Sequence, residues 1–254
     1  MKIAIVTGAS AGMGREFALQ IPHFYKSLDE IWVIARRRDR LASLSESKEM
    51  PYRIFQGDLQ KEEIYQDLAQ ALEEEKPDIR MLVNAAGFGK MGSVKEISYR
   101  EPDSQAEMID LNCRALTRMT LLCLPYIRFG GRIVNLASAA AFCPQPSFAV
   151  YAATKSYVLS FSRALGAELK SQRIYVTAVC PGPVDTEFFD VSGRLPNMWK
   201  DAMMANPKKV VRRALIDTRK KKEVSVYGPA MKAARLGAKL LPHRAVINFI
   251  FHKH

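Results

Sequence analysis

The order of hydrophobic and polar positions along the chain alternates between two patterns. Short apolar runs rich in β-branched residues predict strands, and the longer segments between them carry apolar residues at helical spacing. This alternation predicts an α/β fold of the Rossmann type, with a doubly wound parallel sheet and helices on both faces. The expected strands are Lys2–Val6, Ile31–Ala35, Arg53–Gln56, Ile79–Asn84, Arg132–Ala137, Ile174–Val179 and Glu223–Tyr227, and the expected helices start at about Gly14 or span Glu62–Glu75, Ser104–Tyr126 and Tyr151–Leu169.

The chain contains no internal repeat, low-complexity stretch or linker, so we expect its 254 residues to form a single domain. Its hydrophobic content of 48% is enough for a full core. No run of 18 or more apolar residues is present, which argues against a membrane span. The apolar stretch Ile3–Val6 is too short for a signal peptide, and we therefore expect a cytoplasmic protein.

Cysteines and histidines do not form a metal-binding pattern. Cys113, Cys123, Cys143 and Cys180 lack CxxC spacing, and the four histidines are not spaced with a carboxylate as a ligand set. We expect free thiols, no disulfide framework and no metal site.

Positive charge is concentrated at the C-terminal end. The net charge is +12, and residues 208–254 hold 13 Lys and Arg against two acidic residues. The rest of the chain, with 25 basic and 24 acidic residues, is nearly neutral. The asymmetry points to a special role for the tail rather than to a generally basic protein.

A glycine-rich turn, TGASAGMG from Thr7 to Gly14, follows the first expected strand and opens the first helix. Gly8 permits a tight turn, Gly12 lets the backbone approach a pyrophosphate, and Gly14 allows close packing of helix and strand. The free N–H groups at the start of the helix attract phosphates. A purely structural turn is the alternative, but the position directly after the first strand favours a dinucleotide site.

Arginines follow the second expected strand, where a fold that prefers NAD usually carries an acidic residue for the ribose 2′-hydroxyl. Arg36 and Arg37 have the planar fork that binds a phosphate through two hydrogen bonds, and Arg15 adds a further cation. These residues predict NADP(H) rather than NAD(H) as the cofactor. A solvated start of a helix is the alternative.

The motifs then match, in order, those of the short-chain dehydrogenase/reductase family, which the chain resembles from Lys2 to about Phe189. After the glycine turn come Gly57-Asp58-Leu59, Asn84-Ala85-Ala86-Gly87, Asn112 within a helix, Ser138 at the end of the fifth strand, Tyr151-Ala152-Ala153-Thr154-Lys155 and Pro181-Gly182-Pro183-Val184-Asp185-Thr186. With the turn and the arginines, the resemblance implies a cofactor site made by Gly8, Ser10, Ala11, Gly12, Met13, Gly14, Arg15, Arg36, Arg37, Asp58, Leu59, Asn84, Ala85, Ala86, Gly87, Tyr151, Lys155, Pro181, Gly182, Val184 and Thr186.

Tyr151 and Lys155 are four residues apart and so share one face of a helix. A phenol titrates near 10, and an adjacent ammonium group is expected to lower the pKa of Tyr151 towards neutrality. Tyr151 then serves as general acid in reduction and general base in oxidation, while Ser138 donates a hydrogen bond to the reacting oxygen. The resemblance implies that Lys155 also holds the nicotinamide ribose and that Asn112 anchors a water for proton relay. A chance pairing of tyrosine and lysine is the alternative.

Apolar residues near the expected site suggest a lipophilic substrate such as a steroid, a bile acid or a fatty-acyl compound. The segment 186–206, where the family carries a variable lid, includes Leu195, Met198, Trp199, Met203 and Met204. Simple packing of the lid onto the core is the alternative. The expected substrate pocket comprises Ser138, Phe142, Gln145, Phe148, Pro183, Phe188 and Phe189.

The tail, residues 229–254, is a basic amphipathic extension in which Met231, Leu240 and Ile247 alternate with Lys232 and Arg235. It could lie on an anionic membrane surface, meet an acidic carrier protein, cover the substrate pocket or a partner subunit, or pack on its own domain. Nucleic-acid binding has only the charge in its favour, so we expect none. The tail departs from the family pattern and puts the usual tetramer in doubt, although we still expect a homo-oligomer, a dimer or a tetramer.

Together these features predict an NADP(H)-dependent oxidoreductase that interconverts a ketone and a secondary alcohol, with a lipophilic small molecule as substrate. Two alternatives stay open. One is a 3-oxoacyl-type reductase that acts on carrier-bound acyl chains, and the other is a catalytically inactive NADP(H)-binding sensor or scaffold.

Overall fold

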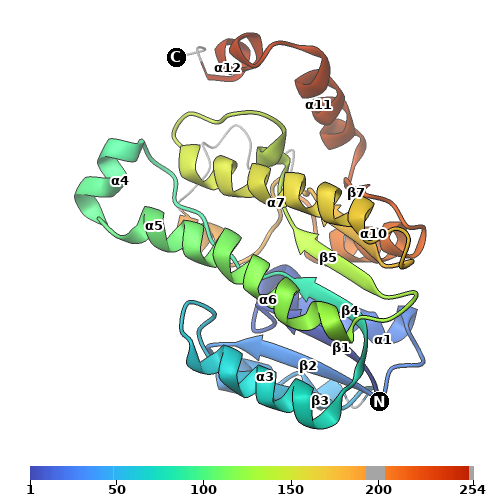
Figure 1. Ribbon diagram of the computed structural model, residues 1–254. Coiled ribbons are helices and arrows are strands. Elements are labelled where there is room, and N and C mark those ends of the chain that lie inside the picture. Colours follow the sequence, from blue (N-terminus) through green and yellow to red (C-terminus); the bar gives the residue numbers. More distant parts are fainter. Residues whose placement is uncertain (48, 193–203, 252–254) are drawn as a thin grey trace.

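The structure, a computed structural model, describes residues 1–47, 49–192 and 204–251. Within these ranges seven parallel strands form one sheet in the order β3-β2-β1-β4-β5-β6-β7 (Figure 1). The strand order therefore reverses between β1 and β4, which is where ligands bind in open α/β sheets. The strands are β1 (Lys2–Thr7), β2 (Glu30–Ala35), β3 (Tyr52–Gln56), β4 (Asp78–Asn84), β5 (Arg132–Leu136), β6 (Tyr175–Val179) and β7 (Val224–Ser225).

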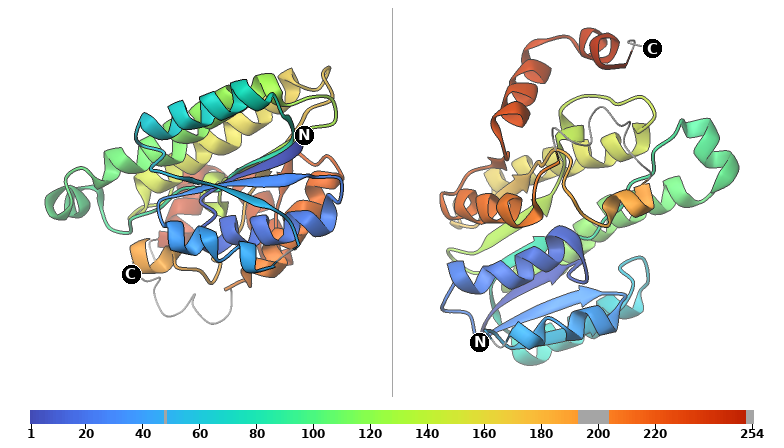
Figure 2. Two further views of the ribbon diagram at one scale, coloured as in Figure 1. Left: turned by 90° about the horizontal axis from the view of Figure 1, so that it is seen from below. Right: turned by 180° about the vertical axis from the view of Figure 1, so that it is seen from behind.

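Helices cover both faces of the sheet, as the views in Figure 2 show. One face carries α1 (Gly12–Phe24), α2 (Arg38–Ala42) and α10 (Pro207–Arg219). The other carries α3 (Glu63–Glu75), α6 (Leu116–Cys123) and α7 (Ala149–Glu168). The remaining helical elements are α4 (Val94–Arg100), α5 (Ser104–Ile109), α8 (Phe188–Ser192), α11 (Pro229–Leu240), α12 (His243–Phe251), a π-helical turn (Asp110–Ala115) and short 3-10 turns at Ser45–Ser47, Leu124–Tyr126 and Ala139–Phe142.

Apolar residues on both faces of the strands build the two halves of the core. In β1, Ala4 and Val6 pack with α1 and α10, whereas Ile3 and Ile5 pack with α3 and α6 on the opposite side. Successive side chains of a strand point to opposite faces, so a strand covered on both sides is a continuous apolar run. This explains the uninterrupted apolar sequences that predicted the strands.

The structure confirms the predicted fold class, with differences at the ends of elements. β5 ends at Leu136 instead of Ala137, because the chain turns there and the amide of Ala137 bonds back to the carbonyl of Asn135 at 3.1 Å. β7 is shorter than predicted, since this edge strand pairs with β6 only through Val224 and Ser225. The predicted helix Ser104–Tyr126 is a continuous helical run, but it consists of α5, the π-helical turn, α6 and the 3-10 turn Leu124–Tyr126 in succession.

Part of the predicted lid falls outside the described residues. The segment after β6 is described up to α8 and again from residue 204. The predictions for Leu195, Met198, Trp199 and Met203 lie outside these ranges.

The tail forms two helices, α11 and α12, which extend from the end of the sheet and lie above α7 in Figure 1. α11 contains no buried residue, and Leu236, Leu240 and Leu241 are more than half exposed. α12 returns to the body, where Val246 is buried. Across the described residues, no helix is long and apolar enough to cross a membrane.

Candidate active site

A cleft of about 690 Å³ lies at the carboxyl ends of the strands. The segments that follow each strand from β1 to β6 line it together with the start of α7. Of the residues predicted from sequence to bind the cofactor or substrate, the cleft contains Gly8, Ser10, Ala11, Gly12, Met13, Gly14, Arg36, Arg37, Asp58, Leu59, Ala85, Ala86, Gly87, Ser138, Gln145, Phe148, Tyr151, Lys155, Pro181, Gly182, Pro183, Val184, Thr186, Phe188 and Phe189.

The glycine turn forms a cradle in which Gly8 and Gly14 occupy positions that no other residue type would fit. Gly8 has φ +67°, and a Cβ there would lie 2.8 Å from the amide nitrogen of Ala86. A Cβ at Gly14 would collide with the carbonyl oxygen of Gly8. The start of α1 carries no side-chain cap, so its first N–H groups are free to meet phosphate oxygens. The turn therefore fits the pyrophosphate of a dinucleotide.

Thr7 joins the two strands between which the cleft opens, a role that our sequence analysis missed. Its Oγ1 accepts hydrogen bonds from the amides of Ala85 at 3.0 Å and Ala86 at 3.2 Å. The loop after β4 is thus fixed against the glycine turn. A hydroxyl at the last residue of β1 was the available signal.

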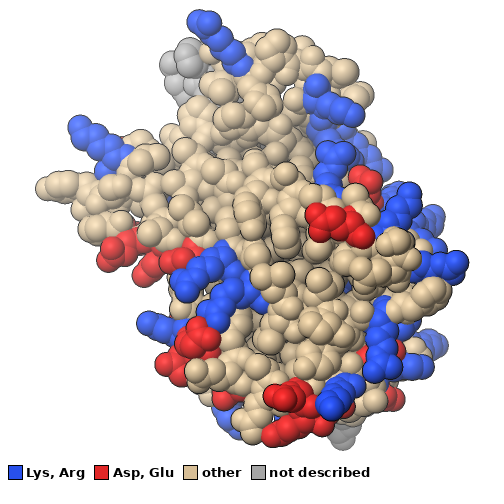
Figure 3. Space-filling model, viewed as in Figure 1, with Lys and Arg blue, Asp and Glu red and all other residues tan. Residues whose placement is uncertain are grey.

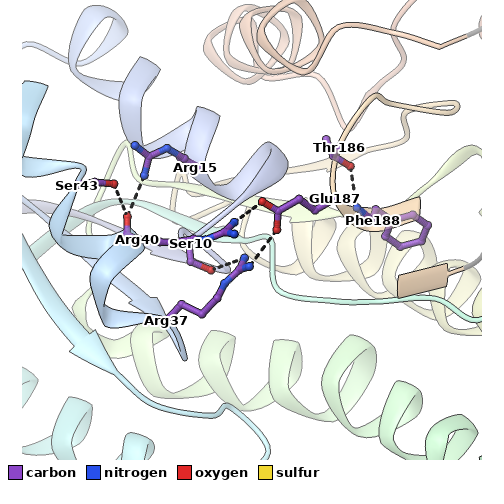
Figure 4. A network of polar contacts seen from close by, with 8 residues as sticks. All are labelled: Ser10, Arg15, Arg37, Arg40, Ser43, Thr186, Glu187 and Phe188. Atoms are coloured by element: carbon purple, nitrogen blue, oxygen red, sulfur yellow. Dashed lines mark hydrogen bonds and ion pairs between the residues drawn. The ribbon is translucent and has the colours of Figure 1, made fainter. Parts of the chain in front are cut away.

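Two arginines, Arg37 and Arg40, lie beside the glycine turn, and both contact the carboxylate of Glu187 (Figure 4). Arg37 donates to one carboxylate oxygen at 3.0 Å and to the hydroxyl of Ser10 at 3.3 Å. Hydrogen bonds from Arg40 and Arg37 hold the pKa of Glu187 below its usual value. Arg40 and Glu187 were both missed from sequence, because Glu187 is 147 residues from Arg40 in the chain.

The other two predicted cations contribute differently. Arg36 lines the cleft, but its side chain is 75% exposed and its contact is a 3.9 Å approach to Asp58. Arg15 points away from the cleft and donates to the backbone carbonyl of Arg40 at 2.9 Å. This contact fixes the position of α2, and the role of Arg15 as a cofactor cation stays a prediction.

Asn84 is not among the residues that line the cleft, and its role as a cofactor ligand stays a prediction. Its side chain is buried and donates to Asn135 at 2.9 Å and to Thr120 at 3.1 Å. Asn135 in turn donates to Ser162 at 2.9 Å. Because this side chain is at the end of β4 but faces the helices, it joins β4, β5, α6 and α7 through a buried polar chain.

The predicted catalytic residues lie together at one end of the cleft. Tyr151 and Lys155 are on α7, and the phenol of Tyr151 is hydrogen-bonded to Ser138 just after β5. The Ser138 hydroxyl also accepts a bond from the amide of Ala140 at 3.1 Å, which fixes its orientation. The Nζ of Lys155 donates to the carbonyl of Leu136 at 2.8 Å and lies 5.6 Å from the centre of the Tyr151 ring.

Burial dominates the titration of this pair. It raises the pKa of Tyr151 to about 12, against the lowering effect of the hydrogen bond with Ser138. It also lowers the pKa of Lys155 to about 8. The expectation that the pKa of Tyr151 is lowered towards neutrality is therefore wrong for this geometry, because desolvation of the phenolate outweighs the hydrogen bond from Ser138. Tyr151 is a protonated donor at neutral pH.

Asn112 lies on the π-helical turn and connects the loop after β4 to α7. Its Oδ1 accepts from the amide of Phe88 at 3.0 Å, and its Nδ2 donates to the carbonyl of Phe88 at 2.9 Å and to Thr154 at 3.0 Å. A Cβ at Gly87 would lie 2.6 Å from Asn112 Oδ1 and 3.4 Å from Lys155 Nζ, so these side chains lie close together around that glycine. Single π-turns often mark functional positions in helices.

Aromatic rings enclose the phenol of Tyr151. Phe148 stacks on it with the ring centroids 4.2 Å apart, and Phe188 lies at 5.5 Å in a tilted arrangement. A Cβ at Gly89 would come within 3.0 Å of all three rings. The ring of Tyr151 is therefore packed between apolar aromatic neighbours.

Phe142, predicted as a substrate-pocket residue, lines a different cavity. This second cavity, of about 340 Å³, lies between the loop after Ala140, the start of α7 and α12. Gln145 lines both the second cavity and the cleft. The second cavity is bounded by Ala141, Phe142, Cys143, Pro144, Gln145, Pro146, Ala149, Ala152, Ala153, Ser156, His243 and Ile247.

The short chain dehydrogenase family model matches residues 2–194, about three quarters of the chain. The chain belongs to the short-chain dehydrogenase family. Among curated relatives of this short-chain dehydrogenase, an uncharacterized oxidoreductase of Staphylococcus epidermidis is 30% identical over 187 residues, covering 73% of this chain and 79% of that protein. Very-long-chain 3-oxoacyl-CoA reductase-B of Danio rerio is 29% identical over 259 residues, covering 98% and 79%.

A solved structure shares the whole fold of this short-chain dehydrogenase. A short-chain dehydrogenase from Sphingobium yanoikuyae in complex with NADPH is 25% identical, with a TM-score of 0.76 over 100% of this chain and 98% of that one. The family assignment makes this chain an oxidoreductase with a nucleotide-binding Rossmann fold. Across the described residues of this short-chain dehydrogenase, no three His, Cys, Asp or Glu side chains gather as metal ligands would.

Proposed function

We propose that this protein reduces a lipophilic ketone to a secondary alcohol with NADPH, and catalyses the reverse oxidation. The observation that carries the proposal is the placement of the Tyr151 phenol beside Ser138, enclosed by aromatic rings in the same cleft that contains the dinucleotide cradle. The nicotinamide cofactor supplies or accepts the hydride, and the residues of the chain handle the proton and the charge.

In reduction, negative charge develops on the carbonyl oxygen of the substrate. The Ser138 hydroxyl donates a hydrogen bond to this oxygen, and Tyr151 donates its proton to it. Phe148 and Phe188 exclude water from the phenol, so the proton comes from Tyr151 rather than from solvent. Lys155 holds the ribose hydroxyls, and Asn112 fixes the backbone at Phe88 and the start of α7.

Two cations support NADPH as the preferred cofactor. Arg37 and Arg40 lie at the carboxyl end of β2 beside Ser10, where a dinucleotide fold meets the ribose 2′-position. Asp58 also lines the cleft, but it follows β3 and lies near the exposed Arg36. A dianionic phosphate suits the first pair better than an uncharged hydroxyl.

The lining of the cleft supports a lipophilic substrate. Phe148, Phe188 and Phe189 form one wall beside Tyr151, with Met91 nearby in the loop after β4. The second cavity under α12 is also mainly apolar, and Gln145 lines both this cavity and the cleft. The second cavity therefore provides room for a long apolar group of the substrate. The name of the Danio rerio relative, a very-long-chain 3-oxoacyl-CoA reductase, agrees with a substrate of this kind.

The tail supports a contact with an anionic membrane surface. No acidic residue follows Glu223, and α11 carries Lys232, Arg235 and Lys239 beside the exposed side chains of Leu236 and Leu240. Figure 3 shows the corresponding upper region of the molecule with blue side chains and no red ones. Apolar side chains bordered by cations favour the interface of an anionic bilayer.

A homo-oligomer is part of the proposal. Exposed apolar side chains occur along the helices of the α3 face, at Ile109, Leu121 and Tyr157. Pairing of two copies through this face would bury them. Light scattering at several protein concentrations tests this, and a mass of one chain at every concentration would contradict it.

The function is tested by following NADPH oxidation with steroid ketones, 3-oxoacyl thioesters and small ketones. We expect turnover of the lipophilic ketones, and loss of most of it, about 100-fold or more, in Tyr151→Phe with cofactor binding retained. Full activity of Tyr151→Phe would contradict the mechanism. Tight NADPH binding without turnover of any ketone would favour the cofactor-binding sensor.

A further inference from the structure

We propose that Glu187 is an internal anion that competes with the 2′-phosphate of the cofactor for Arg37 and Arg40, and so helps to determine cofactor preference. Replacement of Glu187 by the 2′-phosphate on these arginines also couples the adenosine end of the cleft to Phe188, which lies beside Tyr151. This inference rests on the proposed NADPH preference for its biological meaning, but the competition itself can be measured separately.

The first step is the shared carboxylate. Glu187 Oε2 accepts from Arg37 at 3.0 Å, and its Oε1 accepts from Arg40, so each oxygen has its own guanidinium partner (Figure 4). The second terminal nitrogen of Arg37 is directed to Ser10. A phosphate group in the place of this carboxylate would accept the same hydrogen bonds from Arg37 and Arg40.

The second step is the anchoring of the two arginines. Arg15 donates to the carbonyl oxygen of Arg40 at 2.9 Å, and the hydroxyl of Ser43 donates to the same oxygen at 3.0 Å. The backbone of α2 is therefore held beside the glycine turn by α1. Glu187 comes from the opposite side of the cleft, after β6, so its contacts with the arginines span the cleft.

The third step is the strength of the pairing. The side chains of Arg37, Arg40 and Glu187 are 43%, 42% and 46% exposed. Exposed ion pairs contribute little net free energy, because water screens them and long side chains lose freedom. A phosphate monoester carries up to two negative charges and three acceptor oxygens, so it displaces a single carboxylate from this pair of arginines.

The fourth step links the exchange to the catalytic end. Glu187 is followed directly by Phe188, whose amide bonds to the Thr186 hydroxyl at 3.3 Å and whose ring lies 5.5 Å from that of Tyr151. With the arginines taken by the phosphate, the start of α8 loses its attachment to α2. With NADH the attachment stays, and Phe188 keeps its place against Tyr151.

The test compares Glu187→Gln with Asp185→Asn, an exposed carboxylate two residues away that gives the same change in net charge. Calorimetry with 2′,5′-ADP, 5′-AMP, NADPH and NADH measures the affinities. We expect Glu187→Gln to bind 2′,5′-ADP and NADPH about threefold to tenfold more tightly, which is about 1 kcal/mol, with 5′-AMP and NADH unchanged. Asp185→Asn should gain much less. Equal gains in both variants, or weaker binding of all four ligands in Glu187→Gln, would overturn the competition.

Hydrogen exchange of the peptide containing residues 186–192 tests the coupling. In the wild type, exchange should accelerate with 2′,5′-ADP but not with 5′-AMP, and in Glu187→Gln it should already be fast without ligand. Unchanged exchange with 2′,5′-ADP would overturn the link to Phe188. A wild type that binds NADH as well as NADPH would contradict the cofactor preference, whereas the 2′,5′-ADP result would still decide the competition.

Discussion

The ring of Phe148 stacks on the ring of Tyr151 with the two centroids 4.2 Å apart and the planes inclined by 21°. Phe148 precedes Tyr151 by three residues, at the start of the helix that carries the catalytic tyrosine. The stack removes water from the phenol and is one reason why the pKa of Tyr151 is raised to about 12. An aromatic neighbour thus helps to raise the pKa of the catalytic acid.

This relationship predicts an asymmetric pH dependence. Reduction needs the protonated phenol, which persists up to pH 12, whereas oxidation needs the phenolate and should rise throughout the range from pH 7 to pH 10. Phe148→Ala should admit water, lower the pKa of Tyr151 and increase oxidation relative to reduction at pH 8. Steady-state rates in both directions measure this, with Phe189→Ala as the control, since its ring contacts Phe188. Identical pH profiles in wild type and Phe148→Ala would argue against the stack as a cause of the raised pKa of Tyr151.

We expect the buried Lys155 to lower the free energy of unfolding of the protein at neutral pH. Its pKa is about 8 in the folded protein and about 10.5 when unfolded, so its protonation opposes folding below pH 8, and this penalty fades as the pH rises to 10.5. Lys155→Met should therefore gain up to about 3 kcal/mol at pH 7 and about half of that at pH 9.5, less the lost bond to Leu136. Urea unfolding at the two pH values measures the difference. An equal gain in the free energy of unfolding at both pH values would contradict the lowered pKa of Lys155.

The basic residues after β2 should contribute unequally to cofactor binding. Arg37→Gln should weaken NADPH by about tenfold or more relative to NADH, because it removes a charge-assisted hydrogen bond donor beside Ser10. Arg36→Gln is the matched control, since its side chain is 75% exposed and makes no closer ion-pair contact than 3.9 Å in the described residues. Dissociation constants for both cofactors decide the question, and a larger loss in Arg36→Gln would reverse the assignment.

The second cavity should affect the longest substrates most. Ala153→Phe would fill part of this space from α7 and should lower kcat/KM for long-chain ketones, by about fourfold for each methylene excluded. Short ketones should react as before, because Ala153 does not line the cleft. Ser160→Phe, on the same helix but outside the second cavity, serves as control. An unchanged chain-length profile would mean that substrates do not enter this space.

The exposed leucines of α11 predict binding to anionic vesicles. Replacing Leu236 and Leu240 together with Glu should abolish sedimentation with vesicles that contain phosphatidylserine, while NADPH binding is retained. Tyr99→Glu, at a tyrosine on α4 that is 91% exposed, is the control for the added charge. Binding should also weaken as salt is added, because part of the attraction is electrostatic. Equal sedimentation of the wild type and the double variant would contradict this role.

Local sequence was sufficient for the fold and for the positions along the chain of the glycine turn, Tyr151 and Lys155. The apolar runs of the strands and the spacing of glycines are set by contacts within a few residues or within one layer. Contacts between distant segments were not readable in the same way. Nothing near Glu187 in the chain indicates that its carboxylate meets Arg37, 150 residues earlier.

Direction and burial of side chains also escaped the sequence analysis. Asn84 ends β4 like a ligand residue, yet its side chain is on the face that meets the helices. The titration of Tyr151 was inferred from the charge of Lys155 alone, whereas the enclosure by Phe148 and Phe188 depends on how a loop and α8 pack around it. A residue spacing predicts which groups are neighbours, but not how much water is left between them.

The hydrogen bonds from Ala85 and Ala86 to Thr7 also bear on the order of folding. They join segments 78 and 79 residues apart, and the β1–β4 pairing that brings them together is non-local. Such pairings form slowly, because a long loop must close before any contact compensates for its lost entropy. The cradle for the nucleotide is assembled on this pairing, so a refolding chain should acquire helical signal first and the capacity to bind nucleotide in a later kinetic phase.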